Sequence, residues 1–381
     1  MDENQTPLPT YDGESPQQPP ESLRRQLSRS TLIVVLCAVA LVALPVLWGA
    51  FSGEVANWHE AAALEAYLNG DLTTAIRHMD TAIEKDSLND RRLIVRAEYR
   101  RLTGDLAGSL EDCDKAILAS DSIGNRLFRT QVLLEIGLYE KAIEEAKRIN
   151  HEQNGANVTL NNLAYFRAVG NLELEEAAQD IETAITRSAG DVDAQVTTDE
   201  DDKGIIDLSK STKGELKRSL VYDVFRGSDF VGQVVITKKK EQSSQARVVW
   251  TTRHGPIRNG DKIRPDFDAT YLDTRGYISY LRNDLESARR DLDLAVAKFT
   301  HQYQNYFGAQ GSVRHTLIDF RYGALVDLRD VELRKKEMAR AVAVLRYHRA
   351  LVMEKLGEPE LAEKDYKRIR QLGFVPDSKL F

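Results

Sequence analysis

A repeat of 33 to 34 residues runs through the first half of this chain and limits its fold more than any other feature of the sequence. Glycines mark the repeat at Gly70, Gly104, Gly137 and Gly170, spaced 34, 33 and 33 residues apart. Shortly after each glycine begins an i, i+4, i+7 pattern of mostly small or apolar residues, which lie on one stripe of a helix. A helical hairpin cannot bury such a stripe alone, so the sequence predicts that neighbouring hairpins stack on one another.

The stripe recurs six times, and the last two copies lie near the C-terminus. Its members are Ala75, Met79 and Ala82; Ser109, Cys113 and Ala116; Ala142, Ala146 and Ile149; Ala177, Ile181 and Ala184; Ala288, Leu292 and Ala295; and Ala362, Tyr366 and Ile369. The fourth copy begins two residues later after its glycine, Asn283 replaces the glycine of the fifth, and Gly357 precedes the sixth. Because glycine and asparagine tolerate the left-handed conformation, we expect these residues to end the first helix of each hairpin. Seven residues before these turns stands a mostly small residue, at Ala63, Ala97, Thr130, Leu163, Gly276 and Ala350.

The period and the placement of these small residues resemble those of the tetratricopeptide-repeat (TPR) family. The match is degenerate, since the family's tryptophan near the start of the first helix is missing and Ser87 stands where the family has a proline between repeats. The resemblance implies TPR-like repeats at residues 54–190 and 267–375, stacked into a curved superhelix. It also implies a concave groove that binds a protein or peptide partner.

The repeat pattern is weakest between residues 300 and 330. Residues 302–312 are rich in Gln, Asn and Gly and predict a loop. Residues 327–356 carry apolar side chains at helical spacing among charged ones. We therefore predict one long helix there, which extends the first helix of the last repeat.

Between residues 195 and 265 the apolar pattern changes to the alternation that is typical of strands. Strands are predicted at residues 204–208, 221–225, 231–237 and 246–251, and turns at residues 226–229 and 259–261. The predicted fold class is therefore mainly α, a TPR-like helical-hairpin solenoid with an inserted small antiparallel β-barrel or sandwich module.

The order of motifs in this insert resembles that of small β-barrel modules in bacterial envelope proteins. The matching segments are Val224-Phe225-Arg226, Val231-Gly232-Gln233-Val234, Ser244-Gln245-Ala246 and Ile257-Arg258-Asn259-Gly260-Asp261. Residues 211–217 replace the Gly-rich turn of those modules, and the resemblance implies a fold without implying an activity. The consecutive lysines at residues 238–240 either protect a sheet edge with their charge or meet an acidic partner.

Residues 31–52 form an uncharged apolar run near the N-terminus. About 20 such residues cross the hydrocarbon core of a bilayer as a helix, so we predict a transmembrane helix there. A cleaved signal peptide is the alternative, although its apolar part is usually shorter. Residues 1–30 hold five of the ten prolines and predict a disordered tail.

The positive residues near the apolar run predict its orientation. Arg24, Arg25 and Arg29 precede the run, and no Lys or Arg follows it until Arg77. The positive-inside rule then places residues 1–30 in the cytoplasm and the C-terminal domains on the extracytoplasmic side of a single-pass inner (cell) membrane protein. A mitochondrial import receptor, whose repeats face the cytosol, is the alternative for a non-bacterial host.

The sequence offers few groups for chemistry. Its net charge of −7 provides no basic domain for nucleic acid. Cys37 lies in the apolar run and Cys113 in a repeat, so we expect neither a disulfide nor a Cys-based zinc site. Arg253-His254-Gly255 matches the start of the histidine phosphatase motif but lies in the β insert rather than in a large α/β domain. We expect no catalytic residue, cofactor or metal, and a hydrolase that uses the β module is the alternative.

One candidate binding site lies on the first helices of the second and third repeats. Arg92 and Arg96 belong to the second repeat, and Asn125 and Arg129 take equivalent places in the third. In TPR proteins that dock C-terminal carboxylates, basic and Asn side chains of successive first helices clamp the anion. The resemblance therefore implies peptide binding by these four residues, and a solvated basic face paired with nearby acids is the alternative.

These features together predict a membrane-anchored TPR scaffold for protein–protein interactions at the cell envelope. The alternative is a self-assembling structural component of the envelope. In that case copies of the chain would associate with one another through the repeats and the β module.

Overall fold

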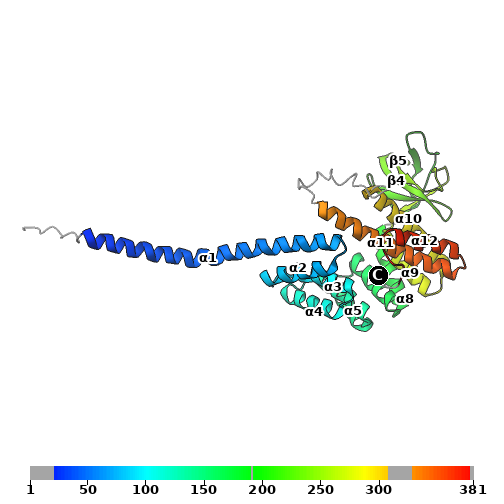
Figure 1. The fold of residues 1–381 in the computed structure, drawn as a ribbon. Coiled ribbons are helices and arrows are strands. Elements are labelled where there is room, and N and C mark those ends of the chain that lie inside the picture. The colour runs from blue at the N-terminus through cyan, green and yellow to red at the C-terminus, as the bar shows by residue number, and fades with distance from the viewer. Residues whose placement is uncertain (1–20, 190–191, 308–327, 378–381) are drawn as a thin grey trace, which may run out of the picture.

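The computed structural model describes residues 21–189, 192–307 and 328–377. A helical body and a β module form the folded part, and one long helix, α1 (Glu21–Leu68), extends away from them (Figure 1). Residues 21–30 belong to this helix, so the prediction of a disordered tail is wrong for them. The rest of that predicted tail, residues 1–20, lies outside the described residues.

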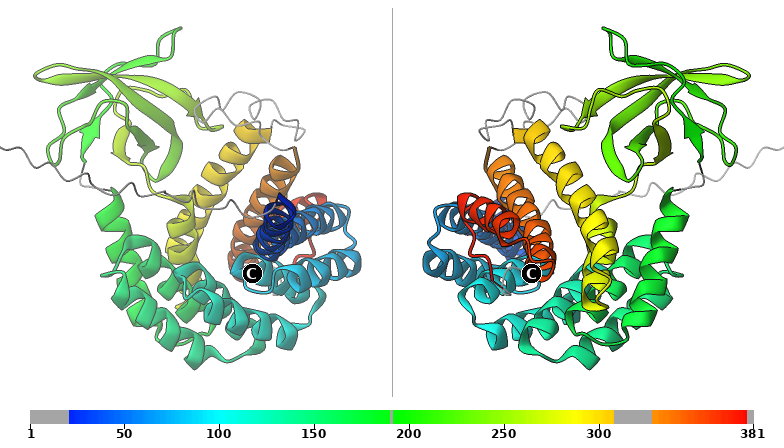
Figure 2. Two further views of the ribbon diagram at one scale, coloured as in Figure 1. Left: turned by 90° about the vertical axis from the view of Figure 1, so that its left-hand side faces the viewer. Right: turned by 90° about the vertical axis from the view of Figure 1, so that its right-hand side faces the viewer.

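Successive helices pair as hairpins, and the C-terminal part of α1 is the first helix of the first hairpin. The helices that follow are α2 (Leu72–Lys85), α3 (Asp90–Thr103), α4 (Leu106–Ala119), α5 (Ile123–Ile136), α6 (Tyr139–Glu152), α7 (Asn157–Val169) and α8 (Leu174–Ala189). Figure 2 shows these hairpins following one another along an arc. The arc confirms that the repeats stack.

The predicted stripes form the core of each hairpin. Every stripe residue is buried except Tyr366, which is partly exposed. The small positions of the first helices, from Ala63 to Ala350, are buried as well. These small residues let the two helices of a hairpin approach closely, because a Cβ added at Gly276 would lie 2.7 Å from Cγ of Leu292.

Left-handed residues end most of the first helices, as predicted. Gly104 and Gly137 have φ angles of 86° and 87°, and positive φ is also found at Gly70, Asn283 and Gly357. The prediction is wrong at Gly170, whose φ is −73°, because Asn171 takes the left-handed conformation instead. The two extra residues of the fourth repeat lengthen this turn and move the reversal off the glycine.

The repeats resume after the β module. Their helices are α9 (Ala269–Leu281), α10 (Leu285–Phe307), α11 (Leu328–Lys355) and α12 (Pro359–Gln371). α11 confirms the predicted long helix. The loop prediction is wrong for residues 302–307, which continue α10, and residues 308–312 lie outside the described residues. Tyr303 and Phe307 explain the longer helix, because both are buried against Ala339 and Val342 of α11.

Among the described residues, the insert forms a six-stranded antiparallel sheet with the order β1-β6-β3-β4-β5-β2. The strands are β1 (Ala194–Gln195), β2 (Ile205–Ser209), β3 (Val221–Arg226), β4 (Asp229–Lys239), β5 (Ser243–Thr251) and β6 (Lys262–Pro265). A bridge between Val196 and Leu208 joins the two outer strands, so the sheet closes on itself. The four predicted strands are confirmed, whereas β1 and β6 were missed because each is too short to show alternation.

A buried ionic cluster fixes the β module to α10. Lys298 of α10 is 3% exposed and donates to the carboxylate of Asp223 in β3 at 3.0 Å, and it also contacts Asp266. Gln233 donates to both carboxylates and accepts a bond from the indole of Trp250. A charge buried this deeply is stable only when it is paired. The cluster therefore holds the module in one orientation on the helix.

Apolar side chains cover the described part of the predicted transmembrane segment. Leu32, Val34 and Leu41 are 58%, 67% and 76% exposed. The structure describes no side chains for residues 43–50. Among the residues that it does describe, no helix is long and apolar enough to span a membrane.

Candidate protein-binding surfaces

The last long helix returns to the first repeats and closes the concave side of the arc. Lys336 of α11 donates to the carbonyl of Tyr67 at 3.2 Å, and its Nζ lies 3.9 Å from the centre of the Tyr67 ring. A guanidinium nitrogen of Arg340 lies 3.5 Å from a carboxylate oxygen of Glu98. We call these two contacts the α11 latch. Both views of Figure 2 show α11 beside α1, so the repeats and α11 surround a common space.

This space holds a central cavity of about 1280 Å³, lined mainly by α3, α5, α7, α9 and α11. Seven aromatic residues line it, namely Phe128, Tyr139, Tyr165, Phe166, Tyr277, Tyr280 and Tyr347. Burial raises the pKa of Tyr277 to about 12, so its hydroxyl stays protonated at neutral pH. A tyrosine joins a broad apolar ring to a polar hydroxyl, and such residues contact both the side chains and the backbone of a bound polypeptide.

A charged cluster lies in the wall of the same cavity. Arg101 is 6% exposed and donates to Glu98 at 2.7 and 2.8 Å and to Glu135 at 2.6 Å. Burial raises the pKa of the Glu135 carboxyl. Burial, together with neighbouring Arg101, lowers the pKa of the Arg340 guanidinium. The cluster therefore links the second and third repeats to the α11 latch.

Arg92 and Asn125, two of the four predicted peptide-binding residues, are buried and bonded within the chain. Arg92 donates to Glu60 at 3.1 Å and to Asn57 at 2.6 Å. Asn125 donates to Asp90 at 2.9 Å. Both lie away from the lining of the central cavity, so the structure places them between helices rather than on the concave surface.

Arg96 and Arg129, the other two, belong to a repeated ion pair that sequence analysis missed. In four of the described repeats, an arginine of the first helix pairs with an acid 16 residues later on the second helix. The pairs are Arg96–Asp112, Arg129–Glu145, Arg275–Asp291 and Arg349–Asp365. The signal was present in the sequence, because each arginine directly precedes the small residue of its first helix. Peptide binding by the four predicted residues stays a prediction, and it requires them to exchange these internal partners.

Two groups with reactive potential, His254 and Cys113, do not line the central cavity, whereas the buried His348 stacks on the cavity residue Tyr277. His254 lies after β5; its side chain is 39% exposed and its Nδ1 is 3.8 Å from a carboxylate oxygen of Asp229. Cys113 is buried, and burial raises the pKa of its thiol to about 12, which keeps the thiol protonated at neutral pH. Within the described parts of the chain, no three His, Cys, Asp or Glu side chains group as metal ligands would.

Comparison with known proteins yields similar folds only. No family model matches the chain, and no curated protein matches it. A tetratricopeptide repeat protein from Parabacteroides merdae shares 13% identity, covers 84% of this chain and 94% of its own, and gives a TM-score of 0.37. The structure of PilW, a type IV pilus biogenesis factor, shares 10% identity, covers 86% and 96% of the two chains and gives 0.39. The apo form of RapI shares 11% identity, covers 84% and 97%, and gives 0.39.

At these sequence identities and TM-scores, the likeness does not by itself assign this chain to a class of protein. The hairpins, their buried stripes and their glycine turns instead establish the class from this chain itself. It has a mainly helical, TPR-like fold with an antiparallel β module.

Proposed function

We propose that this protein is a membrane-anchored scaffold that holds a segment of a partner protein in its central cavity. The cavity carries the proposal, because it is large, faces the inner helices of the repeats and presents aromatic rings. Aromatic side chains are enriched where proteins bind one another, since a rigid ring buries much apolar area at a small cost in conformational entropy. The TPR family that the chain resembles binds its peptides on the same side of the superhelix.

The α11 latch sets the condition for entry of a partner. Lys336 and Arg340 connect α11 to α1 and α3 through partly exposed polar contacts. Such contacts stabilise a structure only slightly. In the described part of the chain, no buried apolar cluster joins α11 to α1 or α3, so a partner segment that displaces α11 from them breaks mainly these polar contacts.

The sequence of residues 31–52 supports the membrane anchor. An uncharged run of this length is sufficient to cross a bilayer. Arg24, Arg25 and Arg29, directly before it, favour a cytoplasmic N-terminus. In that orientation the repeats and the β module lie outside the cytoplasm, where their partner is another protein of the envelope.

Site-specific photocrosslinking in native membranes tests the binding proposal. A photoreactive residue replaces Gln131 or Asn162, which both line the central cavity. The control position is Glu144, whose side chain on α6 is 72% exposed. We expect the two cavity positions to capture the same protein and Glu144 to capture none of it. Equal capture from Glu144 contradicts the proposal, and capture of a second copy of this chain supports the self-assembling alternative instead.

Cysteine labelling tests the anchor and its orientation. Single cysteines replace Ser15 or Asn154 in a chain whose Cys37 and Cys113 are changed to Ala, and a membrane-impermeant maleimide is added to intact spheroplasts. We expect only position 154 to be labelled. Labelling of position 15 alone reverses the orientation, and recovery of the chain in the soluble fraction refutes the anchor.

A further inference from the structure

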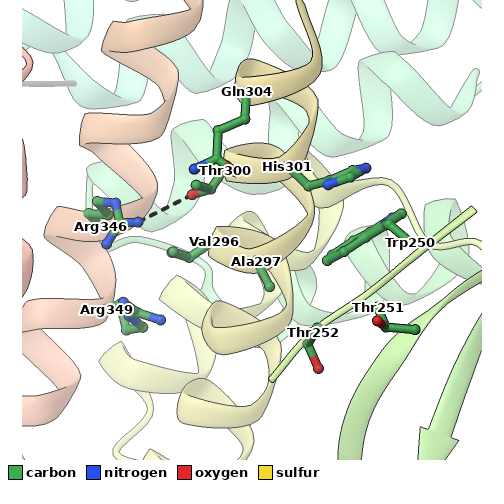
Figure 3. A pocket seen from close by; sticks show the side chains of 10 residues that line it. All are labelled: Trp250, Thr251, Thr252, Val296, Ala297, Thr300, His301, Gln304, Arg346 and Arg349. Atoms are coloured by element: carbon green, nitrogen blue, oxygen red, sulfur yellow. Dashed lines mark hydrogen bonds between the residues drawn. The ribbon is translucent and has the colours of Figure 1, made fainter. Parts of the chain in front are cut away.

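A trough runs along the outer face of α10 and is separate from the central cavity. Two adjoining hollows, of about 350 and 1100 Å³, make up the trough and share the lining residues Thr252, Ala297, Thr300, Gln304 and Arg349. In the smaller hollow α10 lies between the β module on one side and α11 on the other (Figure 3). In the larger hollow α12 adds lining residues on the side of α11. From Glu286 to Gln304 α10 is about 27 Å long, which is room for about eight residues of an extended chain.

Cationic side chains outnumber carboxylates in the trough. Six Arg or Lys residues line it against four Asp or Glu residues, although the net charge of the whole chain is −7. Asp293 and Asp365 are already paired with arginines of the trough. Arg253, Arg290 and Lys364 are exposed and form no ion pair with any residue that the structure describes. The trough therefore has an excess of positive charge, with exposed cations on the β module, α10 and α12, although the carboxylates Asp229 and Glu286 also line it.

One end of the trough combines a flat aromatic surface with a further cation (Figure 3). Trp250 stacks on His301, with ring centres 3.9 Å apart and ring planes 10° apart. Nearby, Arg346 pairs with Asp365 at 2.6 Å and donates to Thr300 at 3.3 Å, and its buried Nε has no hydrogen-bond partner among the described residues. Burial lowers the pKa of Arg346, and the neighbouring charge of Arg349 adds to this effect. A buried donor without an acceptor is costly, and an incoming acceptor would remove that cost.

We propose that the trough is a second binding site, which takes an extended acidic segment of a partner protein. Carboxylates of the segment pair with Arg253, Arg290 and Lys364, and an apolar side chain reaches the Trp250–His301 end. Nucleic acid has the same sign of charge, but a long polyanion is repelled by a protein of net negative charge. A peptide with a few carboxylates places them locally and avoids that repulsion.

Fluorescence anisotropy with the full chain in detergent micelles tests this site. The probe is a fluorescein-labelled, C-terminally amidated octapeptide in which Glu alternates with Phe or Gly. We expect it to bind about tenfold more tightly than the same peptide with Gln in place of Glu, because each exposed ion pair adds a modest increment. The triple variant Arg253→Gln, Arg290→Gln, Lys364→Gln should remove that preference.

A matched control separates a built site from general attraction between charges. The triple variant Lys115→Gln, Arg148→Gln, Arg370→Gln removes three exposed cations outside the trough and changes the net charge by the same amount. It should bind the Glu peptide as the unmodified chain does. Equal weakening in both triple variants overturns the proposal, and so does the absence of a preference for Glu over Gln.

Two further probes exclude other anionic ligands. The first probe is the Gln peptide with a free C-terminal carboxylate. If it binds more tightly than the Glu peptide, the trough binds chain ends and the proposal is overturned. Single-stranded DNA that binds as tightly as the Glu peptide also overturns it. Because the trough and the central cavity have separate linings, the trough variants should leave photocrosslinking from Gln131 unchanged, and the two proposals fail independently.

Discussion

In the helical repeats the same contacts recur from hairpin to hairpin, whereas the β module surrounds one core and is attached through a buried ionic cluster. Ala75, Ser109 and Ala142 take equivalent buried positions in three successive hairpins. The β module instead gathers its buried side chains, Val224 and Ile236 among them, into one cluster. It is attached to α10 through Lys298 and through an apolar cluster in which Phe225 and Phe230 pack with Leu294.

This difference predicts how far the effect of a destabilising substitution should extend through the molecule. In a stack of repeats each interface contributes separately, so loss of one contact weakens one hairpin and its neighbours. The β module is attached at one contact region, where the Lys298 cluster adds to an apolar cluster of Phe225, Phe230 and Leu294. Loss of this contact region should release the whole module from α10 and disrupt the trough while the repeats stay folded.

The largest effect is expected at the attachment. Changing Lys298 to Met leaves Asp223, which is fully buried, without its cation. Breaking a buried ion pair on one side costs about 3–5 kcal/mol of unfolding free energy. Urea denaturation should show this loss in the fluorescence of Trp250, whose indole is bonded to Gln233, before the helical circular dichroism falls. Lys203→Met, at an exposed position of the module, is the control, and equal losses in both variants would break the comparison.

The same variant should acquire a pH dependence. Burial raises the pKa of Asp223 to about 6, above its ordinary value of 3.8. Without Lys298 this pKa rises further, so the folded state keeps a proton that the unfolded state releases. The stability of Lys298→Met relative to the unmodified chain should therefore improve as pH falls from about 8 to about 5. Denaturation at the two pH values measures this, and a penalty that grows on acidification would contradict it.

A smaller loss is expected from the repeated ion pair. Asp112 is fully buried and accepts bonds from Arg96 at 2.9 and 2.6 Å and from Arg100 at 3.0 Å. Asp112→Asn removes the charge but keeps one acceptor, so we expect a loss of about 2–3 kcal/mol. Hydrogen exchange should show faster opening confined to α3, α4 and their neighbours. Lys115→Gln on the outer face of α4 is the control, and opening that spread equally to the β module would contradict separable repeats.

Overpacking of one hairpin tests the role of the small first-helix residue. In Gly276→Ala the new Cβ would meet Leu292 at 2.7 Å and the carbonyl oxygen of Ala288 at 3.3 Å. Such insertion into a packed core costs about 1–3 kcal/mol. Gly124→Ala is the control, since its Cβ would meet only the Ser122 hydroxyl at 3.9 Å. Thermal denaturation should lower the midpoint for the first variant alone, and a stabilised Gly276→Ala would show that the small residue is not needed.

The smallest effect is expected at the α11 latch. Lys336→Gln removes the ammonium over the Tyr67 ring, a contact of about 0.5–1 kcal/mol at a partly exposed site. The loss of global stability should be small. The distribution of distances between spin labels on α1 and α11 should become broader. Lys335→Gln, one residue along the helix and paired with Glu332, is the control. An unchanged distance in Lys336→Gln would show that other contacts keep the ring of repeats closed.

The helical repeats were largely predictable because their signals are local. The stripes and most glycine turns follow from spacing alone, and the long α11 follows from its apolar period. The prediction failed at Gly170, where an insertion moved the turn, and at residues 302–307, where burial of Phe307 against another helix overrides a loop-like composition. At the candidate site, residue type suggested that Arg92 and Arg96 face a ligand. Their acidic partners lie on neighbouring helices, and only the recurrence of a 16-residue spacing from arginine to acid in several repeats could have indicated the partner of Arg96.

The sequence by itself determined the repeat period, the place of the β insert and the uncharged run at residues 31–52. These are patterns among near neighbours, and helix and strand geometry converts them directly into structure. Only the tertiary structure decided that α11 closes the central cavity and that the β module and α10 form a trough. Those features depend on pairs such as Lys336 and Tyr67, 269 positions apart, and Lys298 and Asp223, 75 apart. Contacts at such separations depend on how the whole arc curves, and no local pattern encodes that curvature.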